Sequence, residues 1–175
     1  SDFIKKYWGD DTTPTLPWRT NEQTSMTNNT QTYAWNNYIK PSKDELQAVM
    51  DPLAFRVTQE DSTERAGSSP LDKIWERGIY VDVLSGEPLY SSKDKFDSGT
   101  GWPSFVAPIT PDVLTLHEDR KLFSVRTETR SAIADNHLGH VFNDGPADRG
   151  GLRYCMNGAA LRFVPEAEMV AAGYE

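Results

Sequence analysis

The chain has 175 residues, which is enough for one domain with a sizeable hydrophobic core. Acidic residues outnumber basic ones by 26 to 18, and the net charge of −8 argues against nucleic acid as the main partner. The single cysteine excludes an intramolecular disulfide, and no apolar run approaches the length of about 18 residues that a membrane helix needs.

The N-terminal segment, residues 1–40, is predicted to be a polar arm or linker, and residues 41–175 to form the folded domain. Thr and Asn dominate the arm, so it buries too little apolar surface to offset its ordering entropy. Several aromatic residues could still pin parts of it to the domain, namely Tyr7, Trp8, Trp18, Tyr33 and Trp35. The chain begins at Ser1, so a leader or a fusion partner could have been removed.

Short helices are expected at the edges of the domain. Ser42 and Glu45 form a capping box, a helical run of apolar residues follows, and Asp51-Pro52 should end this helix. Ser69-Pro70 should open a second short helix. A terminal helix over residues 165–172 should stop at Gly173.

From Gly78 onward the hydrophobic period changes to two, which indicates strands. Ile79, Val81 and Val83 alternate, and residues 123–130 alternate with their charged side chains on one face. Further short strands are predicted over residues 138–142, 152–156 and 159–163, with Asn157-Gly158 as a hairpin turn between the last two. The pattern predicts a mainly β, antiparallel domain with small peripheral helices.

Cys155 is the first candidate for chemistry. A lone cysteine is often only a small buried hydrophobe. However, Arg153 beside it would favour a thiolate, and His137 and His140 lie a short way upstream. A thiol with imidazoles elsewhere in the chain is typical of an activated nucleophile, and Asp144 could orient one of the imidazoles.

A metal site and an aromatic binding loop are the other candidates. The pair His137 and His140 lacks third and fourth ligands, because Cys155 is the only cysteine. Glycines and a proline surround Trp102, so this loop could present the indole to a ligand; the alternative is a Trp simply buried under the loop.

Three motifs occur in a fixed order: Gly101–Phe105 (GWPSF), His137–Pro146 (HLGHVFNDGP) and Arg153–Asn157 (RYCMN). Together they closely resemble methionine sulfoxide reductase B, the enzymes that reduce the R epimer of methionine sulfoxide. The resemblance runs from about residue 42 to residue 163. It implies two antiparallel sheets with the active site on one of them.

The resemblance also implies roles for individual residues. Cys155 matches the nucleophile that attacks the sulfoxide sulfur and becomes a sulfenic acid. His140, assisted by His137, matches the group that binds and protonates the sulfoxide oxygen. Trp102 matches the indole that packs on the substrate methyl group. The remaining matches are a carboxylate beside the histidines and residues that shape the site and support the thiolate, namely Asp144, Arg153 and Asn157.

Two departures from the family pattern stand out. Many members hold a structural zinc with two Cys-x-x-Cys pairs, and here those positions are Asp82, Ser85, Ser131 and Ala134, so we expect the zinc-free branch and no metal. Thr100 occupies the common position of the resolving cysteine, whether naturally or through a Cys→Thr change. Recycling of the sulfenic acid is therefore expected from an external thiol: thioredoxin, glutaredoxin with glutathione, or dithiothreitol in vitro.

The leading hypothesis is therefore a peptide-methionine (R)-S-oxide reductase without a bound cofactor. Its partners would be oxidised proteins or peptides and a thiol reductant protein, with no nucleic acid and no membrane. We expect a monomer or a part of a longer fusion chain, in the cytoplasm or, if a leader was removed, outside it. The alternatives are a non-recycling module that binds oxidised Met or another small ligand, and a metal-binding sheet protein using the two histidines.

Overall fold

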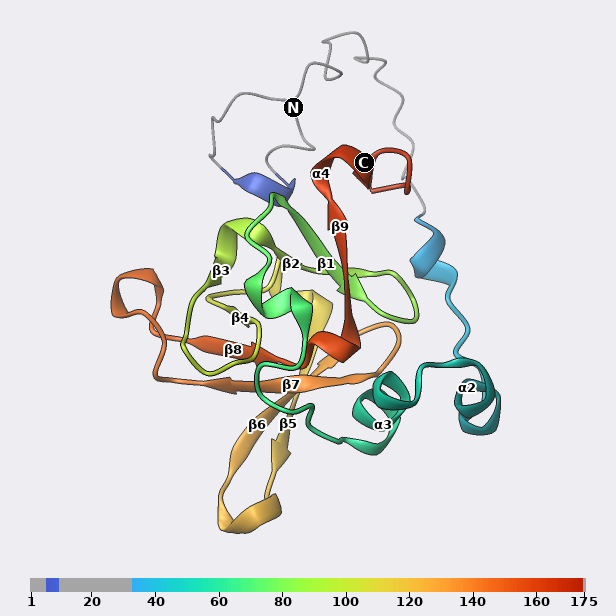
Figure 1. Cartoon of the computed structure of the whole chain (residues 1–175), viewed down its shortest axis with the longest axis horizontal. Coiled ribbons are helices and arrows are strands. Elements are labelled where there is room, and N and C mark those ends of the chain that lie inside the picture. The colour runs from blue at the N-terminus through green and yellow to red at the C-terminus, as the bar shows by residue number, and fades with distance from the viewer. Residues whose placement is uncertain (1–5, 10–32, 175) are drawn as a thin grey trace, which may run out of the picture.

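The fold is built from two antiparallel sheets, as the computed structural model shows for residues 6–9 and 33–174 (Figure 1). The three-stranded sheet has the order β2–β1–β9, formed by Pro88–Ser91, Gly78–Asp82 and Leu161–Pro165. The six-stranded sheet has the order β3–β4–β8–β7–β6–β5. Its strands are Lys95–Phe96, Ser104–Phe105, Arg153–Met156, His137–Phe142, Arg126–Ser131 and Leu114–Asp119. The predicted mainly β class with two antiparallel sheets is confirmed.

The helices are short and lie outside the sheets, as expected (Figure 1). Helix α2 (Lys43–Val49) starts at the predicted cap, where the Ser42 hydroxyl accepts a hydrogen bond from the Glu45 N–H at 3.2 Å. The segment after it was not predicted to be helical, yet Asp51 caps a new helix, α3 (Pro52–Glu60), with proline at its first position. The signal that ends one helix thus begins the next.

The other predicted helices are shorter than expected. Ser69-Pro70 opens only a 3-10 turn, η2 (Pro70–Lys73), and the terminal helix α4 covers Glu166–Met169. Gly173 follows it in the left-handed conformation, with φ of +87°. Within the ranges that the structure describes, no helix has the length and apolar character needed to cross a bilayer. A 3-10 turn, η1 (Ala34–Asn37), precedes α2, and further 3-10 turns lie between strands: η3 (Ser92–Asp94), η4 (Pro111–Val113), η5 (Lys121–Phe123), η6 (Ala147–Arg149) and η7 (Gly158–Ala160).

The predicted hairpin at Asn157-Gly158 is wrong. Strand β8 ends in the six-stranded sheet, whereas β9 pairs with β1 in the other sheet, and η7 lies between them. A tight hairpin of this type needs a positive φ at the asparagine, but Asn157 has φ of −74°. Its side-chain amide is instead bonded to Leu138 and Glu64, which fixes the crossover between the sheets.

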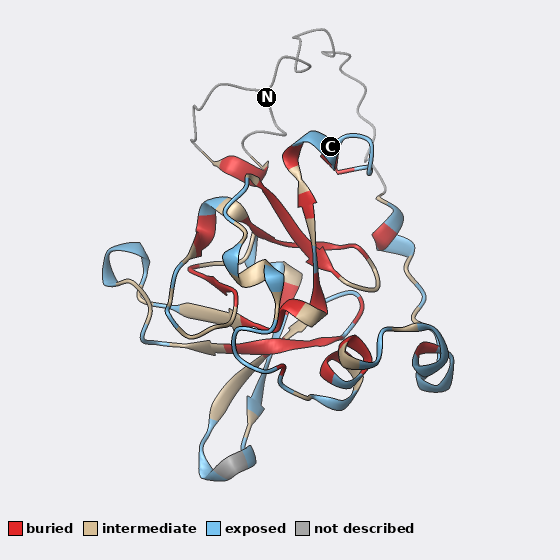
Figure 2. Ribbon diagram, viewed as in Figure 1, coloured by how far each residue is buried: buried red, intermediate tan, exposed pale blue. Residues whose placement is uncertain are grey.

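The main core lies where the two sheets and α3 meet, and strand β1 is buried along its whole length (Figure 2). Tyr80 of β1 belongs to this main core, whereas its neighbours Ile79 and Val81 face the opposite side of the sheet. That side carries a second apolar cluster, which we call the outer core: Tyr7, Trp8, Trp35, Ile79, Val81, Val164, Met169 and Tyr174. Tyr7, Trp8 and Trp35 therefore attach the described parts of residues 1–40 to the domain, as predicted; Trp18 lies outside the described residues.

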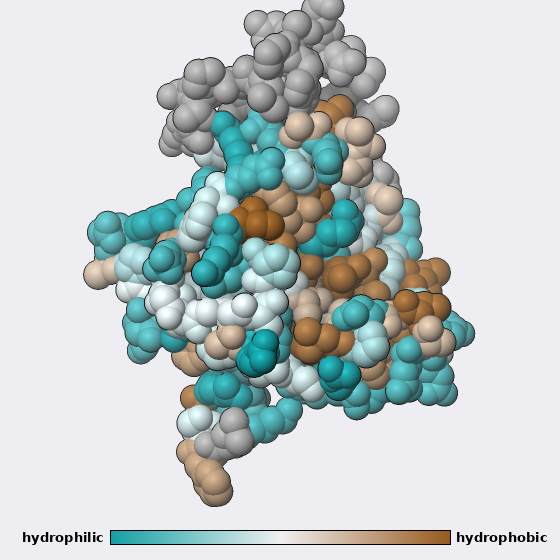
Figure 3. All heavy atoms as spheres, viewed as in Figure 1, coloured by the Kyte–Doolittle hydropathy of each residue, from teal (hydrophilic) through white to brown (hydrophobic). Residues whose placement is uncertain are grey.

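One face of the molecule is largely polar. In Figure 3, hydrophilic side chains cover most of one face, and hydrophobic ones gather at its centre and toward the segment that leads into α2. The β5–β6 hairpin projects from the body of the domain (Figure 1).

Candidate active site

Four strands of the six-stranded sheet place their polar side chains in one transverse row. Ser104 of β4 lies opposite Cys155 of β8, Cys155 lies opposite His140 of β7, and His140 lies opposite Glu128 of β6. Residues directly opposite one another in neighbouring strands project from the same face and touch. The sheet therefore sets the thiol between a hydroxyl and an imidazole.

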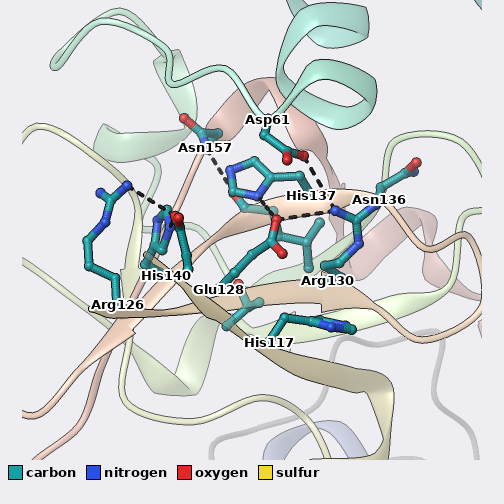
Figure 4. A network of polar contacts seen from close by, with 12 residues as sticks. Asp61, His117, Arg126, Glu128, Arg130, Asn136, His137, His140 and Asn157 are labelled. Atoms are coloured by element: carbon teal, nitrogen blue, oxygen red, sulfur yellow. Dashed lines mark hydrogen bonds and ion pairs between the residues drawn. The ribbon is translucent and has the colours of Figure 1, made fainter. Parts of the chain in front are cut away.

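A β-bulge brings the second histidine to the same side. In a regular strand, residues three apart point to opposite faces, so His137 would point away from His140. The register shifts here: Thr129 pairs with Gly139 but Arg130 pairs with His137, and the skipped Leu138 is buried in the main core. The two imidazole centroids lie 5.5 Å apart, and Figure 4 shows both rings above the sheet. No local pattern in the sequence indicates this bulge.

Most of the predicted site residues line one pocket of about 240 Å³. Six of them do so: Thr100, Trp102, His140, Arg153, Cys155 and Asn157. Arg126 and Phe142 also line it, and neither was predicted. His137 is buried and lies next to His140, whereas Asp144 is exposed. The fold therefore brings the predicted nucleophile, imidazole and indole to one concave surface.

The charge balance at Cys155 is set by burial against nearby donors. Burial raises the pKa of the thiol, while the Arg153 guanidinium and hydrogen bonding with Thr100, Arg153 and Ser104 lower it. Arg153 is fixed for this role, because its guanidinium donates to both carboxylate oxygens of Asp144 at 2.9 and 3.1 Å. It also lies over the Phe142 ring, 4.4 Å from the centroid.

The prediction that Asp144 orients an imidazole is therefore wrong: its carboxylate binds Arg153. Its pKa is lowered by the hydrogen bond from that guanidinium. The loop after β7 turns back toward β8, which places Asp144 beside the arginine that precedes Cys155 rather than beside the histidines. Asp144 thus acts on the thiol through Arg153.

Two carboxylates that sequence reasoning missed hold the histidines. His140 Nε2 lies 2.8 Å from Asp119 Oδ2, and His137 Nδ1 lies 2.6 Å from Glu128 Oε2. The alternation over residues 123–130, with charges on one face, is a signal that could have identified Glu128. Asp119 is the last residue of strand β5, in which Leu114 and Leu116 alternate with polar residues. This alternation is a signal that could have predicted the strand.

Each carboxylate is in turn held by an arginine of β6. Arg126 donates to Asp119 at 3.2 Å, and Arg130 donates to Glu128 at 3.2 Å (Figure 4). A backbone hydrogen bond from Lys121, followed by that with His140, lowers the pKa of Asp119 to about 2. Burial lowers the pKa of His140, and the hydrogen bond with Asp119 only partly offsets this.

Trp102 is presented to the pocket rather than buried under its loop. It is half-buried, and its indole N–H donates to the Glu64 carbonyl at 3.0 Å. The Glu64 N–H donates to the Asn157 side chain at 2.9 Å, and Asn157 donates to the Leu138 carbonyl at 3.0 Å. Gly101 permits this loop, because it has φ of +88° and a Cβ there would lie 2.8 Å from the Gly67 nitrogen. Asn157 thus ties the indole to strand β7.

One group of acidic and histidine side chains is close enough to hold a metal ion among the described residues: Asp61, Glu128 and His137. The Arg130 guanidinium lies 3.4 Å from Asp61 and 3.2 Å from Glu128 (Figure 4). A cation therefore already neutralises these carboxylates, which makes a divalent ion a poor fit.

The four positions that match the zinc ligands of the family lie in a network of hydrogen bonds here. Asp82 accepts from the N–H groups of Leu84 and Ser85 and from the Asn136 amide. Glu87 accepts from the N–H groups of Ile133 and Ala134 at 3.0 and 2.9 Å. Two buried carboxylates thus join the turn after β1 to the turn after β6.

Comparison with known proteins identifies the family of the chain. Residues 50–165, more than half of the chain, match the SelR domain family. The chain is also 54% identical over 137 residues to the peptide methionine sulfoxide reductase MsrA/MsrB of Vibrio cholerae serotype O1. That match covers 78% of the chain but 36% of the relative, so the chain spans about a third of that protein's length. The chain belongs to the SelR domain family, the methionine sulfoxide reductase B family of oxidoreductases.

Proposed function

We propose that the protein reduces the R epimer of methionine sulfoxide, with Cys155 as nucleophile. The observation that carries this proposal is the placement of Cys155 directly opposite His140 across β7 and β8, in the same pocket as Trp102. A nucleophile, a proton donor and an apolar anchor then surround one small substrate group. The sequence match to the family supports the same reaction class.

The pocket can distinguish the two epimers by holding two substituents of the sulfur. The methyl group packs against the Trp102 indole, and the oxygen lies toward His140. Since Cys155 attacks from a fixed position on the sheet, only one configuration at sulfur places methyl, oxygen and nucleophile correctly together. The rest of the bound peptide substrate extends out of the pocket through its open side.

The reaction transfers one oxygen from substrate to enzyme. The Cys155 thiolate attacks the sulfoxide sulfur and forms an S–S bond, His140 protonates the oxygen, and the S–O bond breaks as hydroxide leaves. Hydroxide then attacks the Cys155 sulfur, and the S–S bond breaks with its electron pair on the methionine sulfur. The net result is sulfenic acid and methionine: the substrate sulfur is reduced and the cysteine sulfur is oxidised. Asp119, whose carboxylate lies 2.8 Å from His140 Nε2, favours the protonated imidazole that this step needs and so opposes part of the effect of burial.

Recycling requires a thiol from outside, because Cys155 is the only cysteine of the chain. An external thiol attacks the sulfenic acid to give a mixed disulfide and water, and a second thiol releases Cys155 as the thiol with an external disulfide. Thioredoxin, glutaredoxin with glutathione, and dithiothreitol are the reductants that we propose. Neither a bound cofactor nor a zinc ion takes part. The proposed substrates are oxidised proteins and, in addition, free methionine sulfoxide.

A turnover assay on resolved R and S epimers of a methionine sulfoxide peptide tests the proposal. With dithiothreitol we expect reduction of the R epimer only, and we expect Cys155→Ser to abolish it. Without reductant, one equivalent of methionine should form and Cys155 should gain one oxygen by mass spectrometry. Failure of every reductant to support turnover would instead favour a module that binds oxidised Met, and reduction by Cys155→Ser would overturn the mechanism.

A further inference from the structure

Three hydroxyl groups form a connected chain next to Cys155. The hydroxyl oxygens of Ser98 and Thr100 lie 2.8 Å apart, and those of Ser98 and Ser104 lie 2.7 Å apart. Ser104 donates to the Trp102 carbonyl at 3.0 Å. We call Ser98, Thr100 and Ser104 the hydroxyl relay.

The relay reaches the thiol at both of its ends. Ser104 lies directly opposite Cys155 in the β4–β8 pair, so the two side chains project from the same face. Thr100 lines the pocket together with Cys155. Hydrogen bonding with Thr100 and Ser104 lowers the pKa of the thiol and so offsets part of the effect of burial.

Counting protons fixes the direction of the relay. Each hydroxyl has one proton to donate. The Ser104 proton goes either to the Trp102 carbonyl or to the Cys155 thiolate, and in both cases Ser98 donates to Ser104. The proton of Thr100 then has three acceptors within reach: the Ser98 oxygen at 2.8 Å, the Trp102 carbonyl at 3.5 Å and the Cys155 sulfur. Rotation of this one hydroxyl switches Thr100 between them.

We propose that this relay takes the place of a resolving thiol: Thr100 donates to the Cys155 thiolate before attack and accepts from the sulfenic acid after it. A thiolate only accepts hydrogen bonds, whereas the OH of a sulfenic acid can donate one. Thr100 meets both states, because its proton returns to Ser98 when its oxygen must accept. The inference rests on the proposed reductase function. The relay thus holds the oxidised sulfur ready for an external thiol without forming a bond to it.

The first test measures the thiolate, with no need for turnover. Since Cys155 is the only thiol of the chain, the rate of its alkylation by iodoacetamide against pH reports its pKa directly. We expect Thr100→Val to raise the midpoint by about one unit, a roughly tenfold lower rate below the midpoint. Thr100→Ser, which keeps the hydroxyl, should match the wild type, and Ser98→Ala should also leave the midpoint in place because Thr100 can still donate to sulfur.

The second test follows the sulfenic acid. The reduced protein receives one equivalent of the R-sulfoxide peptide without reductant, and the sulfenic acid that survives is trapped with dimedone at intervals and measured by mass spectrometry. We expect the wild type and Thr100→Ser to keep the sulfenic acid several-fold longer than Thr100→Val and Ser98→Ala. Ser98→Ala should therefore change the second readout only, which a general loss of structure would not do.

Equal alkylation midpoints in wild type and Thr100→Val, or equal sulfenic acid lifetimes in wild type, Thr100→Val and Ser98→Ala, would overturn the relay. Failure of the proposed function gives a different pattern. In that case the wild type does not reduce the peptide, but hydrogen peroxide still converts Cys155 to the sulfenic acid, and both measurements on the relay can be made on that species. Thermal melting of each variant confirms that it is folded.

Discussion

Burial and a neighbouring carboxylate have opposite effects on the pKa of His140, the histidine beside the thiol. His140 lies in a buried position that lowers its pKa, so that near neutral pH its charged form is disfavoured. Asp119 is the group that opposes this effect, through the 2.8 Å contact to Nε2. The protonation state of the proposed catalytic imidazole thus depends in part on a residue of β5, two strands away.

Replacing Asp119 with Asn tests this control of the imidazole. Asp119 raises the pKa of His140, so its removal lowers that pKa further, and the protonated imidazole is lost at a lower pH. The descending limb of kcat should move down by about one pH unit, with a roughly tenfold lower kcat at pH 7. The pH profile with the R-sulfoxide peptide measures this.

Glu118→Gln is the matched control, since it removes the same charge from an exposed neighbour that binds only Arg120 among the described contacts. Its profile should coincide with that of the wild type. A profile for Asp119→Asn that keeps the wild-type descending limb would contradict the role of Asp119.

The residues that line the candidate site could be predicted from the sequence where they belong to continuous motifs. Cys155, His140 and Trp102 each sit in such a motif, and the structure brings all three into one pocket. Asp119 and Glu128 could not be found this way, because their contacts with the histidines depend on strand register, which links residues far apart in the chain. For the same reason Asp144 was assigned to the wrong partner.

Helices and strands could likewise be predicted where their signals are local, but not where contacts distant in sequence determine them. The capping box of α2 and the alternation of β1 and β6 are local signals, and each predicted the correct element. The hairpin at Asn157-Gly158 failed because the Asn157 amide binds Glu64 and Leu138, both distant in sequence. The bulge at Leu138 likewise has its cause in the main core rather than in the strand itself.

The turn after β1 and the turn after β6 depend on Glu87. Its carboxylate is buried and accepts the N–H groups of Ile133 and Ala134 as well as the Ser85 hydroxyl. Glu87→Ala leaves the buried Ala134 N–H and the part-buried Ile133 N–H and Ser85 hydroxyl without this partner, at about 1–3 kcal/mol for a fully buried donor and less for the others. We expect the free energy of unfolding in urea to fall by about 2–4 kcal/mol at pH 7.

The exposed Glu76 offers a control for this change, because Glu76→Ala removes the same side chain and charge from the surface. It should alter the free energy of unfolding by less than about 0.5 kcal/mol. If Glu87→Ala were as stable as Glu76→Ala, the two turns would have to be joined by other contacts.

The pocket and the outer core lie in different parts of the molecule. The pocket lies on the six-stranded sheet next to the main core, while the outer core lies on the far side of β1 and includes Tyr7 and Trp8. Trp8 is central to the outer core, since it is almost fully buried and the Arg77 guanidinium lies 4.4 Å from its ring centroid. Loss of this anchor should affect the stability of the fold far more than the reaction.

Replacing Trp8 with Ala tests this separation. Removal of a large buried side chain should lower the free energy of unfolding by about 3–5 kcal/mol, and so the melting temperature. Well below that temperature, kcat for the R-sulfoxide peptide should stay within about twofold of the wild type, because β7 and β8 keep their register. Trp75→Ala, at a side chain that is 56% exposed, should change melting much less. A large fall in kcat at full folding for Trp8→Ala would show that the outer core shapes the active site as well as anchoring the chain.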